Sequence, residues 1–177
     1  MRPQLVSLIA LFALGACETV SVAPYSPSPD NVAALQQRVQ AGGTRLALGT
    51  VSTGSNVPSA INCRGVNLDV AQGRSLSDYL RDAIQQELML AGGLGSSPAE
   101  TLSIAIDSVR LTTSPTGSWL LSATVTPASG LPFSVAHDHA FKSSFVGSSA
   151  CPMAGAAFGF AVRGLIQKIV THPDLPK

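Results

Sequence analysis

Three runs of alternating apolar and polar residues constrain the fold of this chain more than any other feature of its sequence. They cover residues 101–112, 118–126 and 132–145, and turn residues separate them at Ser114-Pro115-Thr116-Gly117 and Pro127-Ala128-Ser129-Gly130. A period of two predicts strands with one buried face, and the short turns between the runs predict an antiparallel meander.

Helical patterns surround these strands. A further β-like run covers residues 45–53, and helices are expected over 32–41, 75–91 and 152–171. In the clearest helix Ser75 can act as the N-cap, and one apolar stripe contains Leu76, Leu80, Ala83, Ile84, Leu88 and Ala91. The order of elements predicts an α+β two-layer sandwich, in which the two longer helices cover one face of a four-stranded, largely antiparallel sheet.

The first 16 residues predict export. Arg2 is followed by an apolar or small stretch from Leu5 to Ala16, which is too short for a membrane span of about 20 residues and typical of a secretory signal. The stretch ends in Leu14-Gly15-Ala16-Cys17, which resembles the lipobox of bacterial lipoproteins. That resemblance implies that Cys17 is acylated and becomes the mature N-terminus.

The expected organisation is a lipoprotein signal peptide at 1–16, a lipidated Cys17 with a Pro/Ser-rich tether to residue 31, and one α+β domain at 32–177. Glu18, in place of an aspartate, resembles the sorting signal of lipoproteins on the periplasmic face of the outer membrane, and makes the inner membrane the alternative. Cys63 and Cys151 form an even pair in an exported chain, so a disulfide between them is expected. It would fasten the long loop at 54–74 to the start of the last helix.

The sequence offers little catalytic chemistry. Its 177 residues include 11 basic and 10 acidic side chains, a balance that gives no electrostatic basis for binding nucleic acid. No phosphate-binding, nucleophile-elbow or zinc-protease motif is present. We therefore expect neither an enzyme nor a cofactor.

One alternative rests on His137 and His139, which flank Asp138 in a predicted strand and would share a face. A metal-assisted hydrolase could use these residues, but a zinc site needs three or four ligands. No spacing argument brings the third histidine, His172, near them, so no metal site is expected. A bulge near Asp138 would separate the two histidines from the apolar face of the same strand.

Several segments resemble a group of uncharacterised proteobacterial envelope lipoproteins. They are Cys63-Arg64-Gly65, the helix from Ser77-Asp78-Tyr79-Leu80 to Glu87-Leu88, Gly117-Ser118-Trp119, and the helix from Ala150-Cys151 to His172-Pro173. More distantly the chain resembles the lipopolysaccharide-assembly lipoprotein, YajG-type lipoproteins and the auxiliary lipoproteins of ABC-type lipid transporters. The resemblance implies a lipid-anchored periplasmic accessory or binding module that docks to an envelope protein or a lipid-transport complex. A purely structural envelope lipoprotein is the other alternative.

Overall fold

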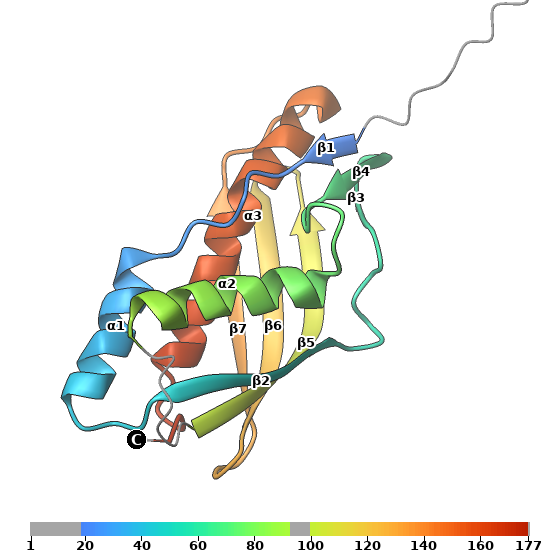
Figure 1. The fold of residues 1–177 in the computed structure, drawn as a ribbon. Coiled ribbons are helices and arrows are strands. Elements are labelled where there is room, and N and C mark those ends of the chain that lie inside the picture. Colours follow the sequence, from blue (N-terminus) through green and yellow to red (C-terminus); the bar gives the residue numbers. More distant parts are fainter. Residues whose placement is uncertain (1–18, 93–99, 177) are drawn as a thin grey trace, which may run out of the picture.

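The computed structural model describes residues 19–92 and 100–176. In chain order the elements are β1 (Thr19–Ser21), α1 (Pro29–Gln40), β2 (Leu46–Thr53), β3 (Ile61–Cys63), β4 (Val66–Asp69), α2 (Leu76–Leu90), β5 (Glu100–Thr112), β6 (Gly117–Pro127), β7 (Phe133–Phe141) and α3 (Gly147–Val170) (Figure 1).

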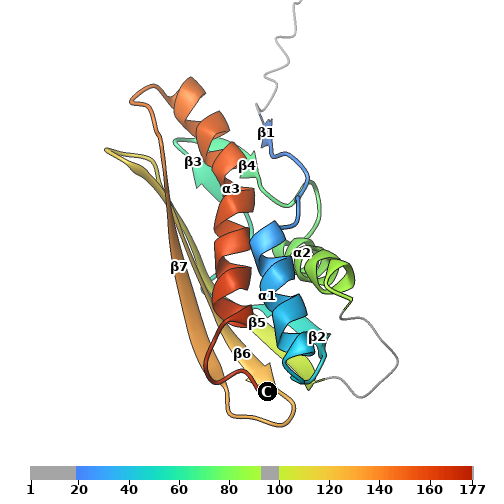
Figure 2. The same ribbon diagram turned by 90° about the vertical axis from the view of Figure 1, so that its left-hand side faces the viewer.

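The main sheet has the order β2-β5-β6-β7, in which β2 is parallel to β5 and the other neighbours are antiparallel. A parallel pair needs a crossover connection, and α2 lies in the connection between β2 and β5 (Figure 1). Figure 2 shows the helices on one side of the sheet and the other face uncovered. The predicted α+β two-layer sandwich is confirmed, with α1 as a third helix beside α3.

Alternate residues of β6 form the centre of the core. Trp119, Leu121, Ala123 and Val125 are buried on the helix side of the strand. The indole of Trp119 donates a hydrogen bond to the carbonyl of Ala154 in α3 at 2.8 Å, and its ring lies 4.9 Å from that of Phe158. Burying one large aromatic ring contributes about 4–6 kcal/mol by its apolar area, so these contacts fasten α3 to the sheet. By length and composition α3 could also cross a bilayer, but its apolar stripe faces β6 and β7 as in a core helix.

A bulge changes the expected faces of β2. The alternation predicts Leu46 and Leu48 on one face and Val51 on the other, yet Leu46 and Val51 are both buried. The register with β5 shifts between Leu48 and Val51, so β2 holds one extra residue there. That residue reverses the alternation and returns Val51 to the core.

The predicted tether is wrong for residues 19–31. β1 pairs in parallel with β4, Val22 is 7% exposed, and Ser28 is the N-cap of an α1 that begins at Pro29, not at Val32. Prolines are tolerated at the first helical position and in extended segments, so Pro/Ser-rich composition does not by itself exclude packing. We call residues 19–28 the N-terminal strap.

The expected long loop at 54–74 also contains secondary structure. β3 and β4 form a hairpin whose two-residue turn, Arg64-Gly65, has positive φ at both positions, 53° and 86°. Such a turn matches the twist of a hairpin, and glycine adopts that conformation without a side-chain clash. The Asn62 side chain accepts a hydrogen bond from the Gly65 amide at 2.7 Å, which supports the turn locally.

The last helix begins earlier than its proline suggests. The helix predicted over 152–171 would place Pro152 in its first turn, but α3 starts at Gly147, so the proline lies in the second turn. The ring is exposed on the outer side of the helix, between the buried Cys151 and Ala154.

Candidate functional site

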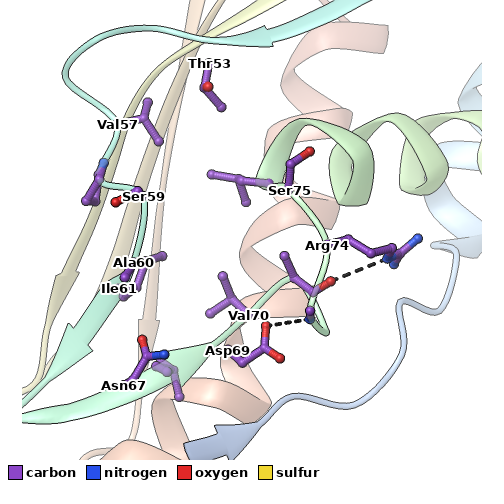
Figure 3. A pocket seen from close by; sticks show the side chains of 15 residues that line it. Thr53, Val57, Ser59, Ala60, Ile61, Asn67, Asp69, Val70, Arg74 and Ser75 are labelled. Carbon is purple, nitrogen blue, oxygen red and sulfur yellow. Dashed lines mark hydrogen bonds between the residues drawn. The ribbon is translucent and has the colours of Figure 1, made fainter.

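An open cleft of about 580 Å³ lies between the β3–β4 hairpin, the segment 57–60 and the start of α2 (Figure 3). Buried Ile61, Leu68 and Val70 contribute apolar surface to it. Its rim is polar and exposed, with Ser59, Asn67, Arg74 and Ser75. Ligand sites commonly combine an apolar floor with a few polar groups and have volumes of about 300–1,000 Å³.

Local hydrogen bonds shape the wall of the cleft that leads into α2. Ser75 accepts from the Asp78 amide at 3.0 Å and donates to the Asp78 carboxylate at 2.6 Å, a reciprocal cap of the kind that begins helices. One residue earlier, Arg74 forms an ion pair with Asp82. Asp69 accepts from the Gly73 amide at 3.0 Å, and this bond is drawn in Figure 3.

The lining of the cleft offers few side chains of the kinds that act as bases or nucleophiles. Its lining includes neither histidine, cysteine, lysine nor glutamate, and its one carboxylate, Asp69, already accepts a backbone hydrogen bond. A catalytic centre needs a nucleophile or base held by an orienting group. The arrangement therefore suits recognition of an apolar side chain or a short peptide segment.

The two cysteines that are predicted to form a disulfide lie beside this region. Cys63 at the end of β3 and Cys151 in α3 are joined by a disulfide, with Cα atoms 5.7 Å apart and a sequence separation of 88 residues. Both are buried. The bond connects the β3–β4 wall of the cleft to the first turns of α3. Cys17, the predicted lipidation site, lies outside the described residues.

His137 and His139 lie on the helix side of β7, and their ring centroids are 6.1 Å apart. The register of β7 with β6 is continuous across Asp138, so β7 has no bulge at this position. Gly164 of α3 instead makes room: a Cβ there would overlap the His137 ring. The His139 ring stacks on Phe160, 5.9 Å away.

Asp138, the third residue of the metal-assisted alternative, points away from the two histidines. Strand alternation places the Asp138 side chain on the open face of the sheet, opposite the two histidines. His172 stacks on Phe133 instead of approaching them, with centroids 4.1 Å apart. Across residues 19–92 and 100–176, no cluster of three His, Cys, Asp or Glu side chains is placed to hold a metal ion.

A buried carboxyl is the functional group that sequence reasoning missed. Glu87 of α2 is fully buried, and it accepts hydrogen bonds from the Tyr25 hydroxyl and from the Ser28 amide, the latter at 3.1 Å. Burial, and then the hydrogen bond to Glu87, raise the pKa of Tyr25 well above its ordinary value. Glu87 lies within the apolar stripe of the helix, three residues after Ile84. A carboxyl at such a position is the sequence signal that could have revealed it. Its partners are both in the N-terminal strap.

The fold defines a small α+β domain with an open cleft beside α2. No protein-family model and no curated protein matches the chain. Among solved structures it is similar to the crystal structure of protein XCC0632 from Xanthomonas campestris, of family DUF330, with a TM-score of 0.49 and 16% sequence identity. The match covers 86% of this chain and 92% of that one.

Proposed function

We propose that this protein is a lipid-anchored accessory module of the bacterial envelope, held on the periplasmic face of the outer membrane, which binds a partner protein through the cleft beside α2. The lipobox-like sequence ending at Cys17 supports the anchor. The disulfide between Cys63 and Cys151 supports an oxidising compartment.

The cleft carries the binding part of the proposal. It is open, its volume of about 580 Å³ suits a short segment of a partner chain, and the disulfide restrains one of its walls. An anchored domain also has a raised effective concentration near membrane complexes. A modest interface is therefore enough for a stable encounter.

Site-specific photo-crosslinking in intact envelopes tests where a partner binds. A photoreactive residue replaces Ser59, on the rim of the cleft, and in a matched control it replaces Ser134, exposed on the uncovered face of the sheet. We expect a discrete adduct from position 59, lost when Ala60→Trp fills the rim. An adduct from position 134 alone would move the interface to the sheet. No adduct from either position would favour the purely structural alternative.

Mass spectrometry of protein extracted from membranes tests the anchor separately. The mature chain should begin at Cys17 and carry acyl chains, and Cys17→Ser should leave an unprocessed precursor or release the domain from the membrane. An unmodified Cys17, or another N-terminus, would contradict the anchor without bearing on the cleft.

A further inference from the structure

Two large apolar side chains are exposed together at one end of the molecule. Phe145 is 83% exposed and Val146 is 60% exposed, in the connection between β7 and α3. Single exposed apolar residues are ordinary, whereas contiguous exposed apolar patches mark interaction sites.

Three hydrogen bonds hold the backbone that presents this pair. Arg64, in the β3–β4 turn, donates to the Phe145 carbonyl at 2.6 Å. Ser143 donates to the Thr113 carbonyl at 2.7 Å, and the Val146 amide donates to the Ser144 hydroxyl at 3.1 Å. The two apolar side chains therefore project from a braced connection, which limits the loss of conformational entropy when they contact a partner.

The charge around this pair has one sign. The described segments that meet here are 61–68, 112–118 and 140–156, and they contain Arg64 and Lys142 but neither aspartate nor glutamate. Positive charge beside exposed apolar side chains is the combination that binds the interface of an anionic bilayer, where rings and alkyl groups enter the headgroup region and cations meet lipid phosphates.

The N-terminal strap approaches the domain from the same end. β1 runs parallel to β4, with Thr19 beside Asn67 and Ser21 beside Asp69. β1 therefore begins on the side of Val66 and the Arg64-Gly65 turn, the turn that holds Phe145. Figures 1 and 2 both place β1, the β3–β4 hairpin and the start of α3 at one end of the molecule. Two residues span at most about 7 Å, so an acylated Cys17 would be attached close to this end.

We propose that this end is a membrane-contact surface, in which Phe145 and Val146 enter the headgroup region of an anionic bilayer and Lys142 faces its phosphates. The Arg64 guanidinium, whose nitrogens donate to Thr113 and to the Phe145 carbonyl, adds positive charge beside them. The orientation rests on the proposed anchor at Cys17, whereas the affinity for lipid rests on the surface itself. In this orientation the strands of the main sheet extend away from the membrane. The β6–β7 turn lies at the far end of these strands (Figure 1).

A tryptophan introduced at each end tests this proposal. Phe145→Trp places an indole at the proposed surface, and Leu131→Trp is the matched control because Leu131 is 85% exposed at the β6–β7 turn. The full-length protein is expressed with its export signal, extracted from membranes and reconstituted in vesicles of phosphatidylethanolamine and phosphatidylglycerol that contain brominated lipid. The native Trp119 is fully buried in the core and supplies a constant background.

We expect the Phe145→Trp protein to show a blue shift and strong quenching by brominated lipid, and the Leu131→Trp protein to show neither. Equal quenching at the two positions, or quenching at neither, would overturn the proposal. If lipid quenching is absent and a photoreactive residue placed at position 145 forms a protein adduct in envelopes, the bilayer proposal is overturned in favour of a protein partner. The N-terminal peptide of the same samples is analysed by mass spectrometry. A missing acyl chain on Cys17 would refute the anchor, while the fluorescence of the introduced indole still reports on the surface.

Discussion

At the scale of single residues, the two histidines of β7 make the stability of the domain depend on pH. Burial beneath α3 lowers the pKa of both His137 and His139. For His137 the positive charges of protonated His139 and of Lys168 lower the pKa further, while Asp138 raises it. Folding therefore favours the neutral form of both rings.

This environment predicts a loss of stability in acid. The unfolded chain takes up protons on these rings below about pH 6.5, while the folded chain resists protonation until a lower pH, so the free energy of unfolding falls across that window. Above the window both states are neutral at these positions and no dependence remains. Urea titrations at about pH 7.5 and pH 5 measure the difference. We expect His137→Gln combined with His139→Gln to reduce this difference; an unchanged difference would contradict the prediction.

A second residue-scale prediction concerns Tyr25. Its hydroxyl is one of two donors to the fully buried Glu87 carboxyl, and a buried polar group that loses a partner retains the cost of its desolvation. Tyr25→Phe should therefore lower the free energy of unfolding by about 1.5–3 kcal/mol. Chemical denaturation measures the change, with Ser26→Ala at the exposed next position as the control. A loss as small as that of the control would show that Glu87 does not depend on Tyr25.

At the scale of elements, the disulfide joins a short strand to a long helix. In the chain-entropy description, a cross-link over 88 residues stabilises the folded state by about 4–5 kcal/mol. Cys63→Ala combined with Cys151→Ala should cost about that amount and should loosen the β3–β4 hairpin first. Hydrogen exchange at β3 and β4, compared with exchange at β6, measures this. Uniform destabilisation without preferential exchange in the hairpin would contradict its role in holding the cleft.

The elements that could be predicted from the sequence are those with long periodic patterns. β6 and β7 alternate over nine or more residues, and β5 alternates from Glu100 to a register shift after Ile106. The stripe and Ser75 cap of α2 are local signals. β1, β3 and β4 have three or four residues each, which is too few for a period to appear. The pairing of β1 with β4 joins segments far apart in the chain, so only the folded arrangement reveals it.

The candidate site was predictable to the same limited extent. The expectation of export, with Cys17 set aside as the predicted lipidation site, left an even pair of cysteines and predicted the bond between Cys63 and Cys151. The cleft was not predictable, since its walls depend on how the β3–β4 hairpin lies against α2. The surroundings of Phe145 and Glu87 could not be predicted either, because both residues contact residues from other elements.

At the scale of the whole molecule, the N-terminal strap determines how closely a lipid anchor would hold the domain. A free tether from residue 17 to residue 31 would let the domain move over tens of ångströms. The strap instead pairs with β4, buries Val22, and accepts hydrogen bonds from Gln72 at the Val22 carbonyl, 3.0 Å, and from Arg163 at the Ser26 carbonyl, 2.6 Å. An anchor at Cys17 would therefore position the domain directly at the membrane.

Limited proteolysis measures whether the strap stays bound in solution. Proteases of broad specificity cleave segments that can leave the surface, so a flexible tether would be cut at once, whereas a packed strap is cut only after local opening. We expect the folded protein treated with proteinase K to retain residues 19–28, as determined by intact mass. Val22→Asp places a charge in the core contact of the strap and should shift the first stable N-terminus to the start of α1, near Pro29. Ala23→Asp, at the exposed next position, is the matched control and should leave the strap protected. Cleavage within residues 19–28 at equal rates in all three proteins would show that this segment is a flexible tether. An anchor at Cys17 would then not fix the orientation of the membrane-contact surface.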